Sequence, residues 1–349
     1  MKILIECFHG IGDFVCALPM IKSLRDRYSE AKFTVLVKFD INAQLLSLSK
    51  IHVDQVIVWD VYKSGLKRNF KLVYSLRKEH YDFFVSSFQT PIKKAKLLAF
   101  LIKANKNLGC QFKNDIILNK LSKSTHFVDG NLLGISEICN NKLIDTVPHL
   151  YPNLELQLKV KSQLEKFNSK QIIGLCIGEG NYFLKNRLTR SGKFFAKGWG
   201  IDKFNCLIKQ LLENKYGVIL IGGKQEIPLL NGIDKCFLSN KNLLNCVGKV
   251  DISTSVAISS LCDLVVGVDT GMIHIAAAVG SKTLSIFGPT SSFCCGAKSL
   301  NSHFSDGKSF CTYAPCFGTK HFSLCNDRKC LKYQSVDLIY NRIELLLNC

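Results

Sequence analysis

The chain has no uninterrupted apolar run of the ~18 residues needed to cross a bilayer. The longest candidate, residues 261–288, is interrupted by Asp263, Asp269, His274 and Lys282. The first residues also lack the basic segment, apolar stretch and small-residue cleavage site of a secretory signal. We therefore expect a cytoplasmic protein that is soluble or peripheral on the inner membrane.

Acidic side chains are scarce, because 27 Asp and Glu stand against 46 Lys and Arg, a formal charge of +19. The excess favours anionic partners such as nucleic acid, a phosphorylated glycolipid or an acidic membrane face. The sequence has no RNP, KH, zinc-finger or helix-turn-helix signature, and its basic residues are dispersed. We expect no nucleic-acid partner, with a basic nucleic-acid-binding protein as the non-enzymatic alternative.

The chain also lacks short-period repeats and low-complexity tails. Instead, short apolar runs alternate with segments of helical period, which is typical of βαβ units with a parallel sheet. The strand-like runs are residues 2–7, 33–38, 55–60 and 83–88, then 172–178, 218–223, 263–269 and 283–289. We predict an α/β protein with two doubly wound, Rossmann-like domains, residues 1–160 and 161–349.

Four motifs directly follow predicted strands: HGIGDF, CIGEGN, GGKQE and DTGMIH. Ligands of open α/β sheets bind outside the carboxyl ends of strands, and with two such domains the cleft between them is the expected site. The first motif has Gly10 and Gly12, but Val15 stands where a dinucleotide-binding loop needs a third glycine. The glycines can serve a tight turn, and Asp13 can cap a helix beginning near Phe14 or act as a base.

In DTGMIHIAAAVG, a strand end is followed at once by a helix. Backbone N–H groups after Asp269 and the Thr270 hydroxyl can meet an anionic group there, and His274 follows one turn later. The alternative is that Asp269 or Thr270 only caps the helix. Lys197, taken alone, is a solvated surface charge.

Together these motifs resemble glycosyltransferase family 9, the ADP-heptose:lipopolysaccharide heptosyltransferases. The similar segments run in order over nearly the whole chain: GIGDFVCALPMIKSLRDRYSEAKFTVLV, the pair Lys197 and Trp199, IGGKQE, and VDTGMIHIAAAVGSKTLSIFGPT. The resemblance implies a GT-B fold and inverting transfer of heptose from ADP-heptose to a lipopolysaccharide core or related glycan.

The resemblance also implies roles for single residues. Asp13 would be the general base, and Lys197 would stabilise the leaving diphosphate without a metal in the chemistry. Glu226 would lie near a ribose hydroxyl and Val250 on the adenine. The family's phosphate loop differs from CIGEGNYFLKNRLTRSGKFF, which leaves the phosphate contact open among Thr189, Ser191 and others. The implied donor-binding residues are Gly12, Thr189, Ser191, Glu226, Val250, Asp269, Thr270, Gly271 and His274.

The basic residues of the first half suit an anionic glycolipid acceptor. Lys63, Lys67 and Arg68 are candidate acceptor contacts, and IKKAKLLAFLIKANK could form a helix on the inner leaflet of the cytoplasmic membrane. A solvated amphipathic helix packed on the sheet is the alternative for that segment.

Cysteine is plentiful, with sixteen residues in a chain that shows no export signal, so most should be buried thiols. Cys311, Cys316, Cys325 and Cys330 follow a C-x4-C-x8-C-x4-C spacing that could hold a structural zinc or iron ion. Because the gaps are longer than those of a CxxC knuckle, unligated thiols are the alternative.

Other activities stay open at this point. The chain could use another nucleotide-sugar donor or a protein acceptor, or it could be a nucleotide-sugar epimerase, which releases product without an acceptor. An inactive paralogue that acts as an assembly partner is a further alternative.

Overall fold

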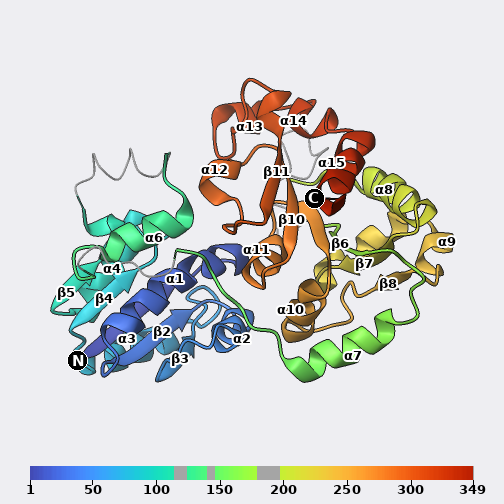
Figure 1. Cartoon of the computed structure of the whole chain (residues 1–349). Coiled ribbons are helices and arrows are strands. Elements are labelled where there is room, and N and C mark those ends of the chain that lie inside the picture. Colours follow the sequence, from blue (N-terminus) through green and yellow to red (C-terminus); the bar gives the residue numbers. More distant parts are fainter. Residues whose placement is uncertain (114–123, 140–145, 179–196, 349) are drawn as a thin grey trace. The chain divides into compact units, whose positions relative to one another are not determined.

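The computed structural model describes residues 1–113, 124–139, 146–178 and 197–348. The chain forms two compact units, Met1–Tyr151 and Pro152–Cys349 (Figure 1). Each unit has a parallel sheet with helices on both faces, so the GT-B expectation of two Rossmann-like domains is confirmed.

The first unit has a five-stranded parallel sheet in the order β3-β2-β1-β4-β5. Its strands are β1 (Lys2–Cys7), β2 (Lys32–Val37), β3 (Gln55–Val58), β4 (Phe83–Ser86) and β5 (Lys106–Leu108). Its helices are α1 (Ile11–Arg27), α2 (Asp40–Leu48), α3 (Leu66–Lys78), α4 (Ile92–Ile102), the 3-10 turn η1 (Cys110–Phe112) and α6 (Phe127–Ile135).

Alternation along the strands divides the core of this unit into two layers. Leu4 and Phe84 pack with Trp59 on the face that α3 and α4 cover, and the Trp59 indole N–H donates to Asn69. On the other side, α1 packs against α6 through Cys16 and other buried side chains.

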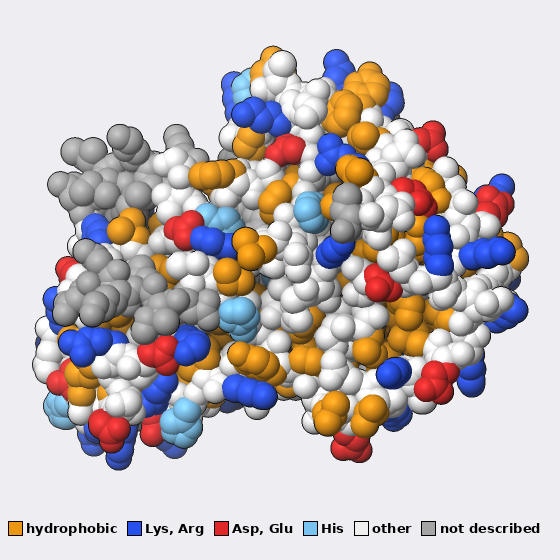
Figure 2. Space-filling model, in the orientation of Figure 1, with side chains coloured by type: hydrophobic (Ala, Val, Ile, Leu, Met, Phe, Trp, Pro, Cys, Tyr) orange, Lys and Arg blue, Asp and Glu red, His pale blue; other side chains and the backbone are white. Residues whose placement is uncertain are grey.

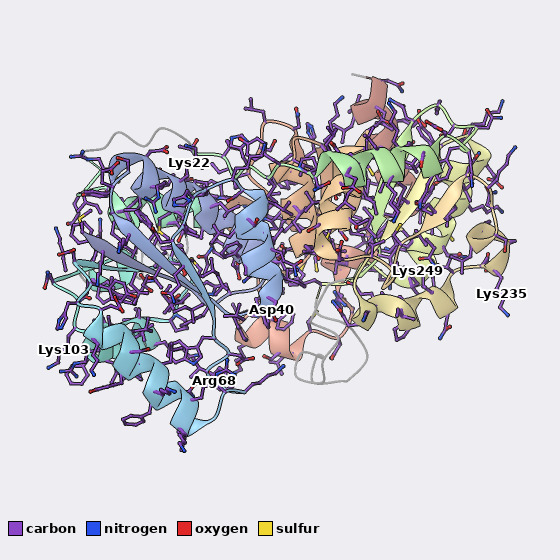
Figure 3. All side chains as sticks on the ribbon, turned by 90° about the horizontal axis from the view of Figure 1, so that it is seen from below. Lys22, Asp40, Arg68, Lys103, Lys235 and Lys249 are labelled. Atoms are coloured by element: carbon purple, nitrogen blue, oxygen red, sulfur yellow. The ribbon has the colours of Figure 1, made fainter. Side chains whose placement is uncertain are left out.

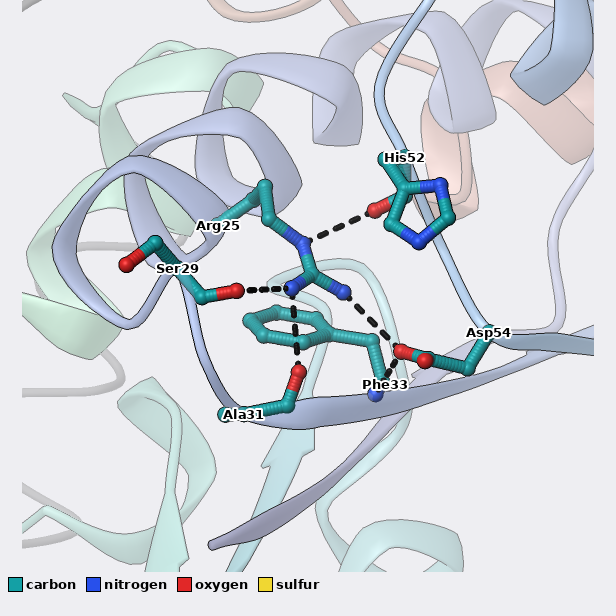
Figure 4. A network of polar contacts seen from close by, with 6 residues as sticks. All are labelled: Arg25, Ser29, Ala31, Phe33, His52 and Asp54. Carbon is teal, nitrogen blue, oxygen red and sulfur yellow. Dashed lines mark hydrogen bonds and ion pairs between the residues drawn. The ribbon is translucent and has the colours of Figure 1, made fainter.

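Arg25 ties the end of α1 to the beginnings of β2 and β3 (Figure 4). Its guanidinium donates to the carbonyls of Ser29, Ala31 and His52, pairs with Asp54 at 3.1 Å, and lies 4.0 Å from the centre of the Phe33 ring. Arg25 also lines a pocket of about 310 Å³, together with Lys22, Lys50, His52, His149 and other residues. This pocket contains none of the predicted site residues, so it is not the candidate site.

The second unit has a six-stranded parallel sheet in the order β11-β10-β9-β6-β7-β8. Its strands are β6 (Ile172–Cys176), β7 (Gly217–Ile221), β8 (Leu243–Asn245), β9 (Leu264–Val268), β10 (Lys282–Phe287) and β11 (Ser302–Asp306). The larger helices are α7 (Leu154–Leu164), α8 (Ile201–Glu213), α10 (Ile252–Ser260), α11 (Gly271–Ala278) and α15 (Val336–Asn348). Shorter segments are η3 (Lys224–Gly232), α9 (Lys235–Leu238), α12 (Ser292–Cys295), η4 (Gly307–Ser309), α13 (Lys320–Leu324) and α14 (Lys329–Lys332).

Helices α7, α10 and α11 cover one face of this sheet, and α8 and α15 cover the other. Val160 and Leu164 bury α7 in the second unit, and Gln157 donates to Ser260 of α10. The boundary between the two units therefore falls before α7, at Pro152. The sequence analysis had placed it after residue 160, which lies inside α7. Trp199 is buried on the α8 side, and its indole N–H donates to the Gln334 carbonyl.

All eight predicted strands are present, whereas the short strands β5, β8 and β11 were not predicted. None of the described helices is both long and apolar enough to span a membrane. All fifteen described cysteines are thiols, and nine of them are buried, which confirms the expectation for most cysteines. Lys and Arg side chains are spread over both units on the face shown in Figure 2.

Candidate active site

The carboxyl end of β1 leads through a short loop into α1. Gly10 is the N-cap of α1, and nothing lies within 4 Å of the position that a Cβ would take. The helix begins at Ile11 rather than near Phe14, so Asp13 lies inside the first turn and is not the N-cap residue. Gly12 lies in the same turn. The half-buried Asp13 carboxylate is favoured there by the partial positive charge of the helix N-terminus.

Next to this loop lies the buried carboxylate of Glu6, which the sequence analysis missed. Glu6 is fully buried in β1, and its oxygens accept hydrogen bonds from the Phe8 N–H and from the Ser86 and Thr90 hydroxyls at 2.8–2.9 Å. Thr90 also lies 2.9 Å from Nε2 of His9. The signal was an acidic residue directly after the apolar run ILI of the strand KILIEC, but its partners on β4 and beyond are distant in sequence.

Burial sets the titration of both ionisable groups in this network. It raises the pKa of Glu6, against the hydrogen bonds from Phe8, Thr90 and Ser86 that lower it. It lowers the pKa of His9 to about 4, and the charges of Lys38 and Lys94 lower it further. His9 is therefore neutral at pH 7, with Nε2 held between the Ser87 and Thr90 hydroxyls.

Two amide side chains form hydrogen bonds with the loop that follows β4. Nε2 of Gln111 donates to the carbonyls of Ser87, Phe88 and Thr90 at 2.6–3.1 Å. Oδ1 of Asn131 accepts from the Phe88 N–H. The hydroxyls that contact His9 are thus held on a rigid loop.

The predicted acceptor contacts lie elsewhere in the first unit. Lys63, Lys67 and Arg68 are exposed, in the turn before α3 and in its first turn. Their role as acceptor contacts stays a prediction.

In the second unit, Lys197 and Asp269 form a largely buried ion pair. Nζ of Lys197 lies 2.5 Å from Oδ2 of Asp269, and their side chains are 12% and 8% exposed. Lys197 is therefore not the solvated surface charge that it would be taken alone. Asp269 follows β9 directly, so the pair lies at the carboxyl end of that strand.

The helix after this pair has its N-terminus at the same strand end. Thr270 is the N-cap residue of α11, but its side chain makes no capping hydrogen bond. The alternative considered from the sequence, that the Thr270 side chain caps the helix, is therefore not observed. Gly271 begins the helix, and His274 is buried one turn later. Backbone N–H groups at this end of α11 suit an anionic ligand.

Glu226 is buried at the ends of β6 and β7. Its Oε2 accepts from the Gly223 N–H at 2.7 Å. A Cβ on Gly178 or Gly222 would lie within 2.6 Å of the Glu226 carboxylate, so both positions leave it room. Val250 packs against the core beside α10. Thr189 and Ser191 lie outside the described residues.

The four cysteines of the predicted metal site are neighbours without forming a ligand set. Burial raises the pKa of Cys330 to about 12 and also raises that of Cys316, and the other thiols of the cluster raise both further. Among the described residues, no three Cys, His, Asp or Glu side chains are grouped closely enough to hold a metal ion.

Comparisons with known proteins give one consistent family. The model of "Glycosyltransferase family 9 (heptosyltransferase)" matches residues 69–305. Lipooligosaccharide heptosyltransferase 2 of Campylobacter jejuni is 25% identical over 295 residues, covering 83% of this chain and 82% of that protein. Lipopolysaccharide heptosyltransferase 2 of Escherichia coli is 23% identical over 311 residues, covering 83% and 84%. The crystal structure of the E. coli ADP-heptose lipopolysaccharide heptosyltransferase II has a TM-score of 0.71 at 18% identity, covering 100% of this chain and 99% of that one.

Proposed function

Because the chain belongs to glycosyltransferase family 9, the heptosyltransferases, we propose that it transfers heptose from ADP-heptose to a sugar of a lipopolysaccharide-type acceptor with inversion. The enzyme class and heptosyl transfer to lipopolysaccharide follow from the family and the relatives. The ADP donor, the base and the acceptor contacts are our own assignments.

The Lys197–Asp269 pair carries the donor assignment. Asp269 holds Nζ of Lys197 at the strand end where the α11 N-terminus also lies. As the glycosidic bond breaks, negative charge grows on the leaving diphosphate, and an ammonium together with helix amides stabilises that charge. Glu226, at the ends of β6 and β7, is suited to accept a hydrogen bond from a ribose hydroxyl.

Asp13 is the proposed base. An acceptor hydroxyl loses its proton as it attacks the anomeric carbon, and a carboxylate can take that proton. Gly10, the N-cap of the helix whose first turn holds Asp13, has nothing within 4 Å of its Cβ position. The glycolipid acceptor would lie on the first unit, with Lys63, Lys67 and Arg68 as further anion contacts and the inner leaflet as its location.

Calorimetry with nucleoside diphosphates tests the donor site. ADP should bind while UDP binds much more weakly, and Lys197→Ala should weaken ADP binding by about 1.5–3 kcal/mol, the size of a charge-assisted hydrogen bond. The exposed Lys209→Ala is the matched control and should bind ADP normally.

A second variant separates two causes of that loss. Lys197→Ala also leaves the Asp269 carboxylate without its cation, and this charge would repel a diphosphate. Lys197→Met/Asp269→Asn removes both charges, so weak ADP binding in the double variant would exclude repulsion by an uncompensated Asp269 as the cause of the loss. If UDP or GDP bound more tightly than ADP, the donor assignment would be wrong.

A further inference from the structure

Helices α3 and α4 carry exposed apolar side chains that the proposed reaction does not use. Seven of the ten exposed large hydrophobic residues described in Met1–Tyr151 lie on these helices and the turn before α3. Leu66 and Phe70 are 85% and 80% exposed. We call this set the α3–α4 surface; it consists of Val61, Tyr62, Leu66, Phe70, Tyr74, Leu97 and Phe100.

The spacing of these residues places them on the outer side of the helices. Leu66, Phe70 and Tyr74 recur every four residues and form one stripe along α3, whereas Leu76 is buried against the sheet. On α4, the core contacts come from other positions, which include Leu98 and Ile102. The two helices contact each other. In Figure 3, the labels of Arg68 on α3 and of Lys103, directly after α4, show where they lie.

The charged side chains of α3, α4 and the turn before α3 are of one sign, although Asp60 and Glu79 lie directly outside this range. Residues 61–78 and 91–106 contain no Asp or Glu. They contain eleven exposed cationic residues: Lys63, Lys67, Arg68, Lys71, Arg77, Lys78, Lys93, Lys94, Lys96, Lys103 and Lys106. The surface therefore combines apolar projections with a dense positive field.

This combination selects one kind of partner. A second copy docking face to face would place the same cations against each other, because a two-fold interface uses the same patch twice. A nucleic acid would satisfy the charge and leave the aliphatic stripe of Leu66 and Leu97 in water. We infer that the α3–α4 surface docks on a bilayer containing anionic lipid, with its apolar side chains among the acyl chains and its Lys and Arg at the headgroups.

The inference assigns a further role to residues first considered as acceptor contacts. Lys63, Lys67 and Arg68 flank Leu66, so they would contact lipid headgroups. Docking would also bring the unit that carries Asp13 to the membrane where a glycolipid acceptor resides. The docking itself does not depend on the proposed transfer, because vesicle binding is measured without donor or acceptor.

Vesicle co-sedimentation of the full chain tests the inference. The protein should bind vesicles of phosphatidylcholine mixed with phosphatidylglycerol, should not bind pure phosphatidylcholine, and should bind less as salt is raised. Leu66→Ser/Phe70→Ser should weaken binding about 10-fold or more through lost apolar burial. The matched control is Leu154→Ser/Leu158→Ser on α7, which removes two exposed leucines at the same spacing, 69% and 59% exposed, and should bind as the wild type does.

A charge variant keeps the test valid if the apolar variant fails to fold. Lys67→Glu/Lys71→Glu changes only exposed positions and should also lose binding to the anionic vesicles. Wild-type protein that ignores these vesicles would overturn the inference. Unchanged vesicle binding by Leu66→Ser/Phe70→Ser would overturn it as well, and so would tight binding of duplex DNA that displaces the vesicles.

Discussion

Asp13 can be tested by one substitution, because its position in the first turn of α1 separates its chemical role from its structural one. Asp13→Asn removes the proton acceptor, so turnover should fall by a factor on the order of 10² to 10⁴. Gly10, not Asp13, is the N-cap, so the variant keeps the N-cap residue and loses a favourable charge near the helix N-terminus, about 0.3–1 kcal/mol. Turnover, ADP affinity and melting temperature should be measured on one preparation.

The comparison has a clear negative outcome. Near-normal turnover of Asp13→Asn would exclude this carboxylate as the base and direct attention to His9, which lies in the loop directly before α1. Lost ADP affinity would instead indicate a disturbed fold.

His9 should make stability depend on pH. Its folded pKa of about 4 lies below the ordinary value of 6.5, so the unfolded state binds more protons between these pH values. The free energy of unfolding should therefore fall as the pH decreases from 6.5 to 4, by at most on the order of 3 kcal/mol from this group. Chemical denaturation at several pH values should show a shallower fall for His9→Asn.

The exposed His80→Asn serves as the control. His80 has φ 51°, a backbone conformation that Asn tolerates, and this variant should keep the wild-type pH dependence. Equal slopes for His9→Asn and the wild type would contradict the burial of a neutral His9.

What sequence could reveal at this scale depended on local spacing. Asp13, Lys197 and Asp269 lie in motifs with a recognisable order, and the positions of Asp13 and Asp269 after strand ends were predictable. The pairing of Lys197 with Asp269 was not, because 72 positions separate them. The hydrogen bond from the Thr90 hydroxyl to Glu6 was not predictable for the same reason, because 84 positions separate the two residues.

Among the elements, the segment from Cys311 to Cys330 gives the next prediction. If its four thiols bind zinc or iron as their spacing predicts, elemental analysis should find about one equivalent of metal. Metal binding would require the four thiols to move closer together. Chelation and Cys316→Ser should therefore both lower the melting temperature, and both should have less effect on turnover. The exposed Cys236→Ser should retain the metal. Metal-free protein with a normal melting temperature would show that these four cysteines are unligated thiols.

The apolar content of a strand decided whether it was predictable. Seven of the eight predicted strands lie inside their sheets and have apolar runs, such as LVVGV in β9, which is buried throughout, and the eighth, β3, is an edge strand with the apolar run QVIV. The missed strands β5, β8 and β11 lie at sheet edges, and two of them have only three residues. Edge strands bury less, so their polar residues hide the pattern.

For the whole molecule, the two-domain organisation was predictable because the βα alternation restarts at β6. The division itself was not, because the helical period of α7 does not say which sheet the helix covers. Val160 and Leu164 decide it by packing in the core of the second unit. The net charge likewise indicated anionic partners but not where the cations gather, which only the exposed faces of α3 and α4 define.

The two tryptophans are distributed one to each unit, Trp59 in the first and Trp199 in the second. Both rings are buried, and each indole bonds within its own unit. The chain therefore carries two tryptophan fluorophores that report on different units. Trp59→Phe leaves only the tryptophan emission of the second unit, and Trp199→Phe leaves only that of the first. Since Trp199 is two residues from Lys197, its emission should change when ADP binds at the proposed donor site, without an attached dye.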